Sequence, residues 1–288
     1  MSRYQTVSII IPTFNRCQLL QEAIKSVLNQ TYHNFELIVV DDYSQDGTLD
    51  VVKNFNDARV VYLRQKENGG ISVACNAGIK KAKGEFIFIL NDDDLLAPFA
   101  LEELVKKING SDLSKVGGVY GWSWWVDNNG RTSRIIDSRV RGYIFRKILR
   151  KHIFTNVLVK KLVFSEVGFY KENLRKNEDL DFYLRLAKNY QLDFIPEILT
   201  IIRGHKKEHL SSFSKNNILS ANNVLKNYDC NFGIGRNILA IISPSRLYVS
   251  LSIFKNLLFA IIKMLLNHKL ASQITFIKSI FKKQGIKV

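Results

Sequence analysis

The fold is decided by residues 7–16, which read VSIIIPTFNR. The run up to Ile11 predicts a buried strand, and Pro12, which has no N–H, predicts its end. Further strand-like runs and helical patterns alternate along the next hundred residues. The strands are expected at 35–40, 60–63 and 85–90, and the helices at 19–28, 48–55 and 71–82. This alternation predicts a parallel sheet covered on both faces, with ligands bound beyond the carboxyl ends of its strands.

The composition is that of a globular protein. In 288 residues, 46% are hydrophobic and 24% charged, which excludes a disordered chain and allows one catalytic domain with an appendage. Three widely spaced cysteines predict reduced thiols rather than a disulfide framework or a zinc site. The apolar run at the N-terminus is too short for a signal peptide, and no uncharged stretch reaches the ~20 residues of a spanning helix.

A long strand is expected at 116–126, followed by a turn at 127–130, and a strong helix at about 177–190. The strand carries Trp122, Trp124 and Trp125. We expect these rings to pack in the core, with stacking on a sugar as the alternative.

Positive charge is concentrated at the C-terminal end. The chain has 42 Lys and Arg against 26 Asp and Glu, a net charge of +16, and from Arg203 onward only Glu208 and Asp229 are acidic. Apolar residues recur there at helical spacing, so residues 211–288 are predicted to be a helical, basic, amphipathic module. It suits an anionic membrane surface. The alternatives are a helix packed on the catalytic domain or a homodimer through these helices. No nucleic-acid motif accompanies the charge, so we expect no nucleic-acid partner.

Acidic residues follow two of the predicted strands. Asp41 and Asp42 follow the second, and Asn91-Asp92-Asp93-Asp94 follows the strand at 85–90. Adjacent carboxylates repel one another, and a divalent cation would compensate them. Oxygen ligands alone suit Mg²⁺ or Mn²⁺. In the alternative, one Asp caps the next helix and the others are solvated. The second acidic pair at an equivalent strand end favours a ligand site.

Several enzyme classes lack their motifs. The sequence has no G-x-G-x-x-G after the first strand, no G-x-x-x-x-G-K-[ST] and no G-x-S-x-G. A nicotinamide oxidoreductase, a P-loop enzyme and an α/β-hydrolase therefore lose their main support.

Taken in order, the blocks at these strand ends resemble family 2 glycosyltransferases. The resemblance covers about residues 5–210, and we expect the catalytic domain to occupy 1–210. It is carried by residues 7–16, 41–48, 68–72, 76–78, 83–85, 91–94, 168–169, 177–181 and Arg185. It implies a GT-A, Rossmann-like fold with a mixed sheet flanked by helices. It also implies inverting, metal-dependent transfer of a sugar from a nucleotide diphosphate donor, usually a UDP-sugar.

The resemblance also implies roles for single residues at the donor site. Asp42, with Asp41 as the alternative, would face the base, and Asp92 would meet the ribose. The family often has Asp where Asn91 stands, so the metal could be bound by either Asp93 or Asp94. The residues expected to flank or bind the nucleotide are Pro12, Thr13, Asn15, Arg16 and Asn68.

An inverting transfer also needs a carboxylate that deprotonates the acceptor hydroxyl. The resemblance points to Asp179 as this base, with Glu178 as a neighbour that tunes it. In the alternative, both acids only favour the first turn of a helix. Arg203 and His205 are expected near the diphosphate or the metal, although a solvated histidine is an equal alternative.

The leading hypothesis is a hexosyltransferase-type enzyme that transfers a sugar to a glycan or lipid-linked acceptor in bacterial surface polysaccharide synthesis. It would be cytoplasmic and peripheral on the inner face of the cell membrane. Two alternatives stay open. One is a non-catalytic protein that binds anions or a membrane surface, and the other is a metal-dependent nucleotidyltransferase.

Overall fold

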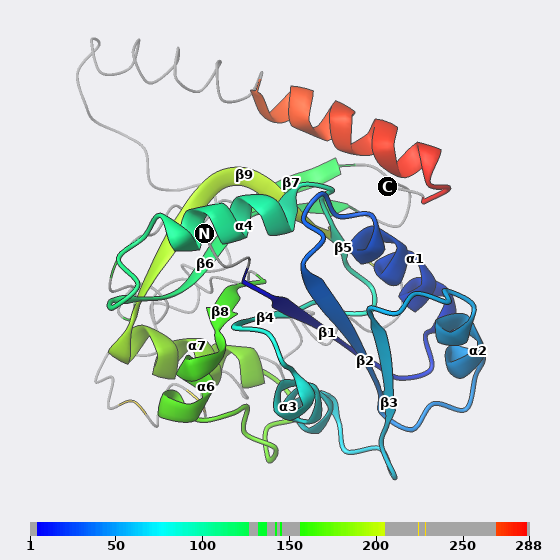
Figure 1. Cartoon of the computed structure of the whole chain (residues 1–288), viewed down its shortest axis with the longest axis horizontal. Helices are drawn as coiled ribbons and strands as arrows, with labels where there is room; N and C mark the ends of the chain where they lie inside the picture. The colour runs from blue at the N-terminus through cyan, green and yellow to red at the C-terminus, as the bar shows by residue number, and fades with distance from the viewer. Residues whose placement is uncertain are drawn as a thin grey trace.

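The computed structural model describes residues 5–126, 132–136, 142, 145, 156–204, 224, 228 and 269–286. Within these residues, one sheet runs in the order β3-β2-β1-β4-β8-β6-β9-β5, with β7 paired to β6 (Figure 1). Its strands are β1 Val7–Thr13, β2 Phe35–Asp41, β3 Val60–Arg64, β4 Phe86–Ile89, β5 Leu95–Leu96, β6 Val116–Val126, β7 Thr132–Ile136, β8 Leu158–Lys160 and β9 Gln191–Arg203.

The sheet is mixed, as the resemblance implies. Strands β3, β2, β1 and β4 are parallel neighbours, which confirms the expectation from the strand–helix alternation. Beyond them the direction changes, because β8 is antiparallel to both β4 and β6. Strand β9 is parallel to β6, and β5 is antiparallel to β9.

The prediction that Pro12 ends the first strand is wrong by one residue. Strand β1 continues to Thr13, and Pro12 is in register with Val40 of β2. Leu90 donates to the carbonyl of Ile10, so even-numbered residues of β1 turn their polar groups toward β4. The last pair with β4 is Ile10 with Ile89, and the missing N–H of Pro12 therefore removes no bond from the ladder.

Helices cover both faces of the sheet (Figure 1). They are α1 Cys17–Leu28, α2 Thr48–Lys53, α3 Ile71–Lys81, α4 Ala100–Asn109, α6 Lys161–Val167 and α7 Glu178–Asn189. Figure 1 shows α3, α6 and α7 below the sheet and α4 above it. Helix α3 approaches the sheet closely through Gly78, where an added Cβ would lie 2.4 Å from Ile10 and 3.1 Å from Val40.

A C-terminal helix at residues 269–283 packs on the same domain (Figure 1). Its Ile277 and Phe281 are fully buried. Lys269 forms a 2.9 Å ion pair with Glu197 of β9, and Lys278 lies 5.4 Å from the ring centre of Trp124. For this helix, packing on the catalytic domain is the alternative that holds.

Most of the predicted C-terminal module, 211–288, lies outside the described residues, as does the predicted turn at 127–130. The module boundary, the membrane contact and the homodimer stay predictions. Among the described helices, none is long and apolar enough to cross a membrane. Trp122 and Trp124 are buried, which confirms the core interpretation for these two rings.

Candidate active site

The ends of β1, β2 and β4 are joined by hydrogen bonds at one edge of the sheet. The Thr13 hydroxyl donates to Oδ2 of Asp92 at 2.8 Å, and the backbone N–H of Asp42 donates to the Thr13 carbonyl at 2.9 Å. Strand β1 lies between β2 and β4, so the three carboxyl ends meet there. Two acidic segments about fifty residues apart thereby flank Thr13.

Arg16 holds two of the acids together. Its Nη1 lies 3.1 Å from Oδ1 of Asp92 and 2.9 Å from Oδ2 of Asp93. The turn that carries it is fastened to the loop after β2. The backbone N–H of Asn15 donates to Ser44 Oγ at 2.9 Å, and the side-chain Oδ1 of Asn15 accepts the N–H of Gln45 at 2.8 Å.

The three aspartates after β4 are buried. Burial, and next the charge of Asp93, raise the pKa of Asp92 to about 6 and also raise the pKa of Asp94 well above its ordinary value. Asn91 donates to Oδ2 of Asp94 at 3.0 Å, whereas Oδ1 of Asp94 is buried without a hydrogen-bond partner among the described residues. A buried carboxylate oxygen without a hydrogen-bond partner suits the role of a cation ligand.

The expected metal therefore suits the residues present. Asp93 and Asp94 would hold it, but among the described residues no group of three or more His, Cys, Asp or Glu side chains could bind a metal alone. Mg²⁺ and Mn²⁺ commonly complete their coordination with water and substrate phosphates.

Asp41 and Asp42 have different surroundings. The Asp41 carboxylate is fully buried and is engaged by the N–H of Ser44 at 2.8 Å, by the hydroxyl of Tyr62 and by Arg64 at 3.3 Å. Asp42 accepts the backbone N–H groups of Gly69 and Gly70 at 2.9 and 2.8 Å. Asp41 thus stabilises the β2–β3 edge, and Asp42 holds the start of α3 through the two glycines that follow Asn68 in the chain.

Glu178 and Asp179 begin helix α7. Partial burial, and then the charge of Asp179, raise the pKa of Glu178 to about 8. Burial likewise raises the pKa of Asp179, although its Oδ1 accepts the N–H of Leu180 at 2.7 Å. Burial, and then the charges of Glu178 and Asp179, raise the pKa of Cys75 on α3, which indicates that α7 begins close to α3.

A buried ion-pair network orients the start of α7. Asp181 is fully buried and accepts from Lys171 at 2.7 Å and from Arg185 at 2.8 Å. Arg185 also donates to the carbonyls of Gly168 and Phe169 at 2.9 and 2.8 Å. The resemblance included Asp181 and Arg185 without giving them a role and did not include Lys171, because a buried salt bridge has no local sequence pattern of its own.

Helix α3 connects the two acidic regions. At its start, Arg175 donates to the carbonyl of Gly69 at 3.4 Å, and Ser72 donates to the carbonyl of Leu174 at 3.2 Å. One turn later, Asn76 donates to the carbonyl of Tyr170 at 2.9 Å. The segment that leads into Glu178 and Asp179 is therefore fastened to the helix whose first turn is held by Asp42.

Arg203, at the end of β9, contacts the loop after β4. Its Nε donates to the carbonyl of Asp93 at 2.6 Å, and it forms an ion pair with Glu22 of α1. Arg203 therefore lies beside the aspartates that follow β4. His205 lies outside the described residues, and its expected role stays a prediction.

Backbone strain is concentrated at the same loops. Four non-glycine residues of the described chain have positive φ, and three of them, Asn15 (53°), Tyr43 (71°) and Asn177 (59°), adjoin candidate residues. Such conformations persist where the surrounding structure fixes them, as at functional sites.

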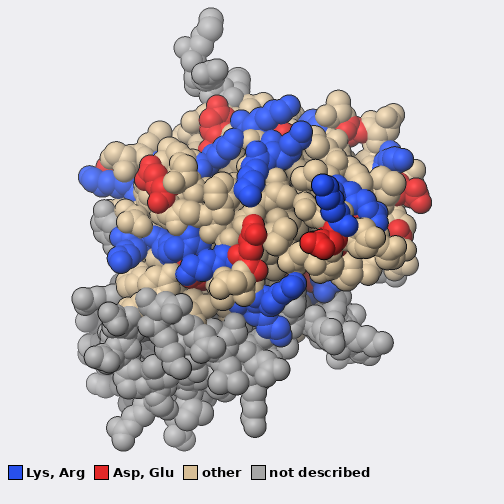
Figure 2. Space-filling view, turned by 90° about the horizontal axis from the view of Figure 1, so that it is seen from below, with Lys and Arg blue, Asp and Glu red and all other residues tan. Residues whose placement is uncertain are grey.

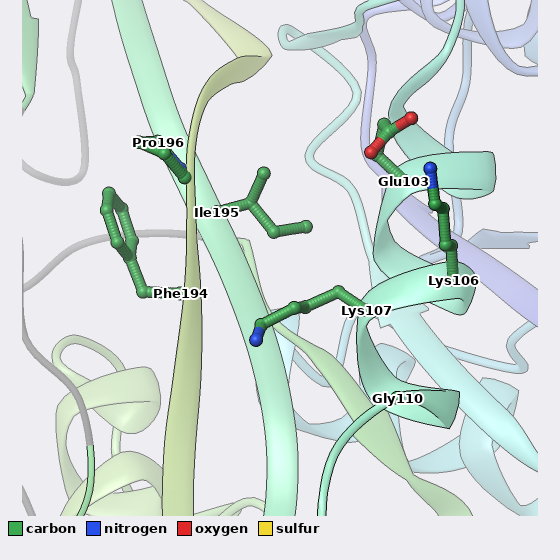
Figure 3. Close-up of a pocket in the computed structure, with 7 residues that line it drawn as sticks. All are labelled: Glu103, Lys106, Lys107, Gly110, Phe194, Ile195 and Pro196. Carbon is green, nitrogen blue, oxygen red and sulfur yellow. The ribbon is translucent and has the colours of Figure 1, made fainter.

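Figure 3 shows a different pocket, of about 310 Å³, between the C-terminal half of α4 and the middle of β9. It is lined by Glu103, Lys106, Lys107, Gly110, Phe194, Ile195 and Pro196. None of the candidate residues lines it, so the strand ends remain the candidate site.

A sequence model of a known family, described as "Glycosyl transferase family 2", matches residues 8–168. The chain belongs to glycosyl transferase family 2. Similar curated proteins include an uncharacterized glycosyltransferase of Rickettsia felis, 34% identical over 220 residues, which cover 73% of this chain and 36% of that protein. The chain thus spans about a third of the length of that relative. The poly(ribitol-phosphate) beta-N-acetylglucosaminyltransferase TarP of Staphylococcus aureus is 32% identical, over 73% of this chain and 66% of TarP.

Solved structures of glycosyltransferases have the same fold as this chain. Residues 1–349 of S. aureus TarS, in complex with UDP-GlcNAc, superpose with a TM-score of 0.62 at 18% identity, over 82% of this chain and 70% of that one. The mannosyltransferase PcManGT of Pyrobaculum calidifontis, in complex with GDP-Man and Mn²⁺, gives a TM-score of 0.55 at 21% identity, over 72% of this chain and 59% of that one. The expected GT-A fold is confirmed.

Proposed function

We propose that this chain transfers a sugar from a nucleotide diphosphate donor to an acceptor hydroxyl, with inversion at the anomeric carbon. The observation that carries the proposal is the joined edge at Thr13, where the acidic segments after β2 and β4 meet. Family membership supports the reaction class.

The donor half of the reaction belongs to this edge. Asp92, held by Thr13, would accept a ribose hydroxyl, and Asp42 would face the base beside Asn68. A Mg²⁺ or Mn²⁺ ion at Asp93 and Asp94 would neutralise charge on the diphosphate leaving group. Asp94 Oδ1, buried without a partner among the described residues, supports this placement.

The acceptor half needs a base on the opposite side of the sugar ring. Asp179 would take the proton of the attacking hydroxyl, and its raised pKa supports this role because a base works best near the pH of the reaction. Glu178, whose pKa is raised to about 8, would hold a proton at neutral pH and leave Asp179 as the acceptor of the pair.

A UDP-sugar is the proposed donor, since TarS is seen with UDP-GlcNAc and TarP is named an N-acetylglucosaminyltransferase. The GDP-Man complex of PcManGT makes GDP-sugars the second choice. The proposed acceptor is a glycan or lipid-linked hydroxyl used in making a bacterial surface polymer. A net charge of +16 favours an anionic acceptor or membrane surface, and Figure 2 shows Lys and Arg side chains spread over the face seen from below.

The proposal is tested by binding and by product analysis. UDP with Mn²⁺ should raise the melting temperature of the full chain, whereas a non-catalytic anion-binding protein would give no such metal-dependent shift. A screen of UDP- and GDP-sugars should then release UDP or GDP. Release of pyrophosphate instead would favour a nucleotidyltransferase. An unchanged melting temperature with UDP and with GDP, each in the presence of Mn²⁺, would contradict the proposal.

A further inference from the structure

Arg16 occupies the carboxylates that a metal ion and a ribose would use. One nitrogen, Nη1, contacts Oδ1 of Asp92 at 3.1 Å and Oδ2 of Asp93 at 2.9 Å. Bonds between a guanidinium and a carboxylate are among the stronger hydrogen bonds in proteins. A cation that binds Asp93 must therefore displace Arg16 or share the carboxylate with it.

Among the described residues, two guanidinium groups contact this cluster, and they differ in how tightly they are held. Arg203 is 10% exposed and is fixed by Glu22, by the carbonyl of Asp93 and by the carbonyl of Leu19. The Arg16 side chain is 33% exposed, and among the described residues its side-chain hydrogen bonds and ion pairs are with Asp92 and Asp93 alone. Arg16 is therefore the group that can give way to an incoming ion.

The net charge around the cluster is negative enough to be balanced by a divalent ion. Counting the described residues with all groups ionised, four carboxylates face two guanidinium groups, an excess of two negative charges. The carboxylates are those of Glu22, Asp92, Asp93 and Asp94, and the cations are Arg16 and Arg203. Without the ion, Arg16 offsets part of the negative charge of Asp92 and Asp93.

We propose that Arg16 is an internal counter-ion that competes with the divalent cation for Asp93 and transfers to the donor diphosphate when the nucleotide binds. This rests on the proposed function. A diphosphate offers the released guanidinium another anionic partner, so nucleotide binding removes the competitor from the metal site. Metal and nucleotide then bind with positive cooperativity, and because coupling is reciprocal, each strengthens the other by the same factor.

The test measures Mn²⁺ binding to the full chain by the loss of the free-ion electron paramagnetic resonance signal, with and without UDP. In the wild type, UDP should tighten Mn²⁺ binding roughly tenfold, within the usual range of coupling energies. In Arg16→Gln, Mn²⁺ should bind more tightly than in the wild type without UDP, and the gain on adding UDP should shrink.

Two further variants control for side effects. Arg16→Lys keeps the charge and should keep the wild-type pattern, which separates loss of charge from loss of fold. Arg59→Gln breaks a similarly exposed ion pair with Asp57 at the start of β3 and should leave Mn²⁺ binding unchanged.

The outcomes separate this inference from the proposed function. If the wild type binds neither Mn²⁺ nor UDP, both are overturned. If the wild type binds both ligands but Arg16→Gln shows the wild-type affinity and the wild-type gain, only the role of Arg16 is overturned.

Discussion

At the scale of single residues, Asp179 is the most direct test of the chemistry. Replacing it by Asn keeps the shape and the first turn of α7 but removes the proton acceptor, so kcat should fall by roughly 10²–10⁴ while donor binding stays near wild type. Donor affinity and turnover are measured separately, with a UDP-release assay and a UDP titration. The control is Asp50→Asn on the exposed side of α2. A variant with full turnover would remove Asp179 from the mechanism.

Glu178 gives a pH-dependent prediction. Its folded pKa of about 8 exceeds the ordinary 4.5, so the folded state binds the proton more tightly than the unfolded state. Its contribution to the free energy of unfolding is therefore full below about pH 4.5 and is lost as the pH rises to about 8.

Glu178→Gln removes this loss. Its melting temperature should match the wild type at pH 4.5 and exceed it at pH 9, by roughly 2–4 °C for each kcal/mol of relief. Glu67→Gln, an exposed change, should show no such crossover. Parallel melting curves for wild type and Glu178→Gln across the whole range would contradict the raised pKa.

The sequence predicted part of the site's residues but not the hydrogen bonds and ion pairs between them. Thr13, Arg16 and Asp92 were expected near the nucleotide, and the structure joins them by hydrogen bonds. The contact of Arg16 with Asp93 and the burial of Asp41 under Tyr62 were not predicted. Both depend on pairs far apart in the chain, which no local pattern encodes.

At the scale of elements, α3 connects the proposed donor and acceptor regions, and Gly78 sets the distance of this helix from β1. An added Cβ would meet Ile10 at 2.4 Å, so Gly78→Ala must push the helix off the sheet and should cost about 1–3 kcal/mol. Urea unfolding measures the loss. The matched control is Gly110→Ala at the end of α4, where the nearest atom would be 3.5 Å away. Equal stability of the two variants would contradict close packing of α3.

The regular elements of the first hundred residues follow from periodicity, and their predicted ends are within a few residues. Strands β5, β7 and β8 were not predicted, and of β9 only a strand-like end at residues 201–204 was. Strand β5 has two residues and exists because Leu95 and Leu96 pair with Ile201 and Thr200. Strand β9 contains Pro196 and Glu197, which interrupt the apolar pattern, and it is stabilised by its pairing with β6.

At the scale of the whole molecule, the helix at 269–283 is predicted to stabilise the domain that it covers. Phe281 is 1% exposed, and truncating a buried Phe costs about 3–5 kcal/mol, so Phe281→Ala should melt well below the wild type. Phe276 is 53% exposed and stacks on Phe99, and Phe276→Ala should cost much less. Equally small losses would mean that the helix does not pack on the domain in solution.

The sequence predicts a basic, amphipathic helix at the C-terminal end, but it does not predict which surface covers the apolar side of that helix. Amphipathic periodicity shows that a helix has an apolar side, and it does not show whether lipid, a second copy or the chain's own domain covers that side. For residues 269–286 the covering surface is the chain's own, through Ile277 and Phe281. The salt bridge from Lys269 to Glu197 could not be foreseen from spacing.

The position of Arg203 has an evolutionary implication. It fastens the last residue of β9 to the carbonyl of Asp93, so the polypeptide leaves the sheet within a hydrogen bond of the donor edge. If the proposed function is correct, the segment that follows Gly204 starts beside the proposed donor site. We therefore expect that exchanging the segment after Gly204 between relatives of unequal length changes the acceptor preference and leaves the proposed nucleotide site unchanged.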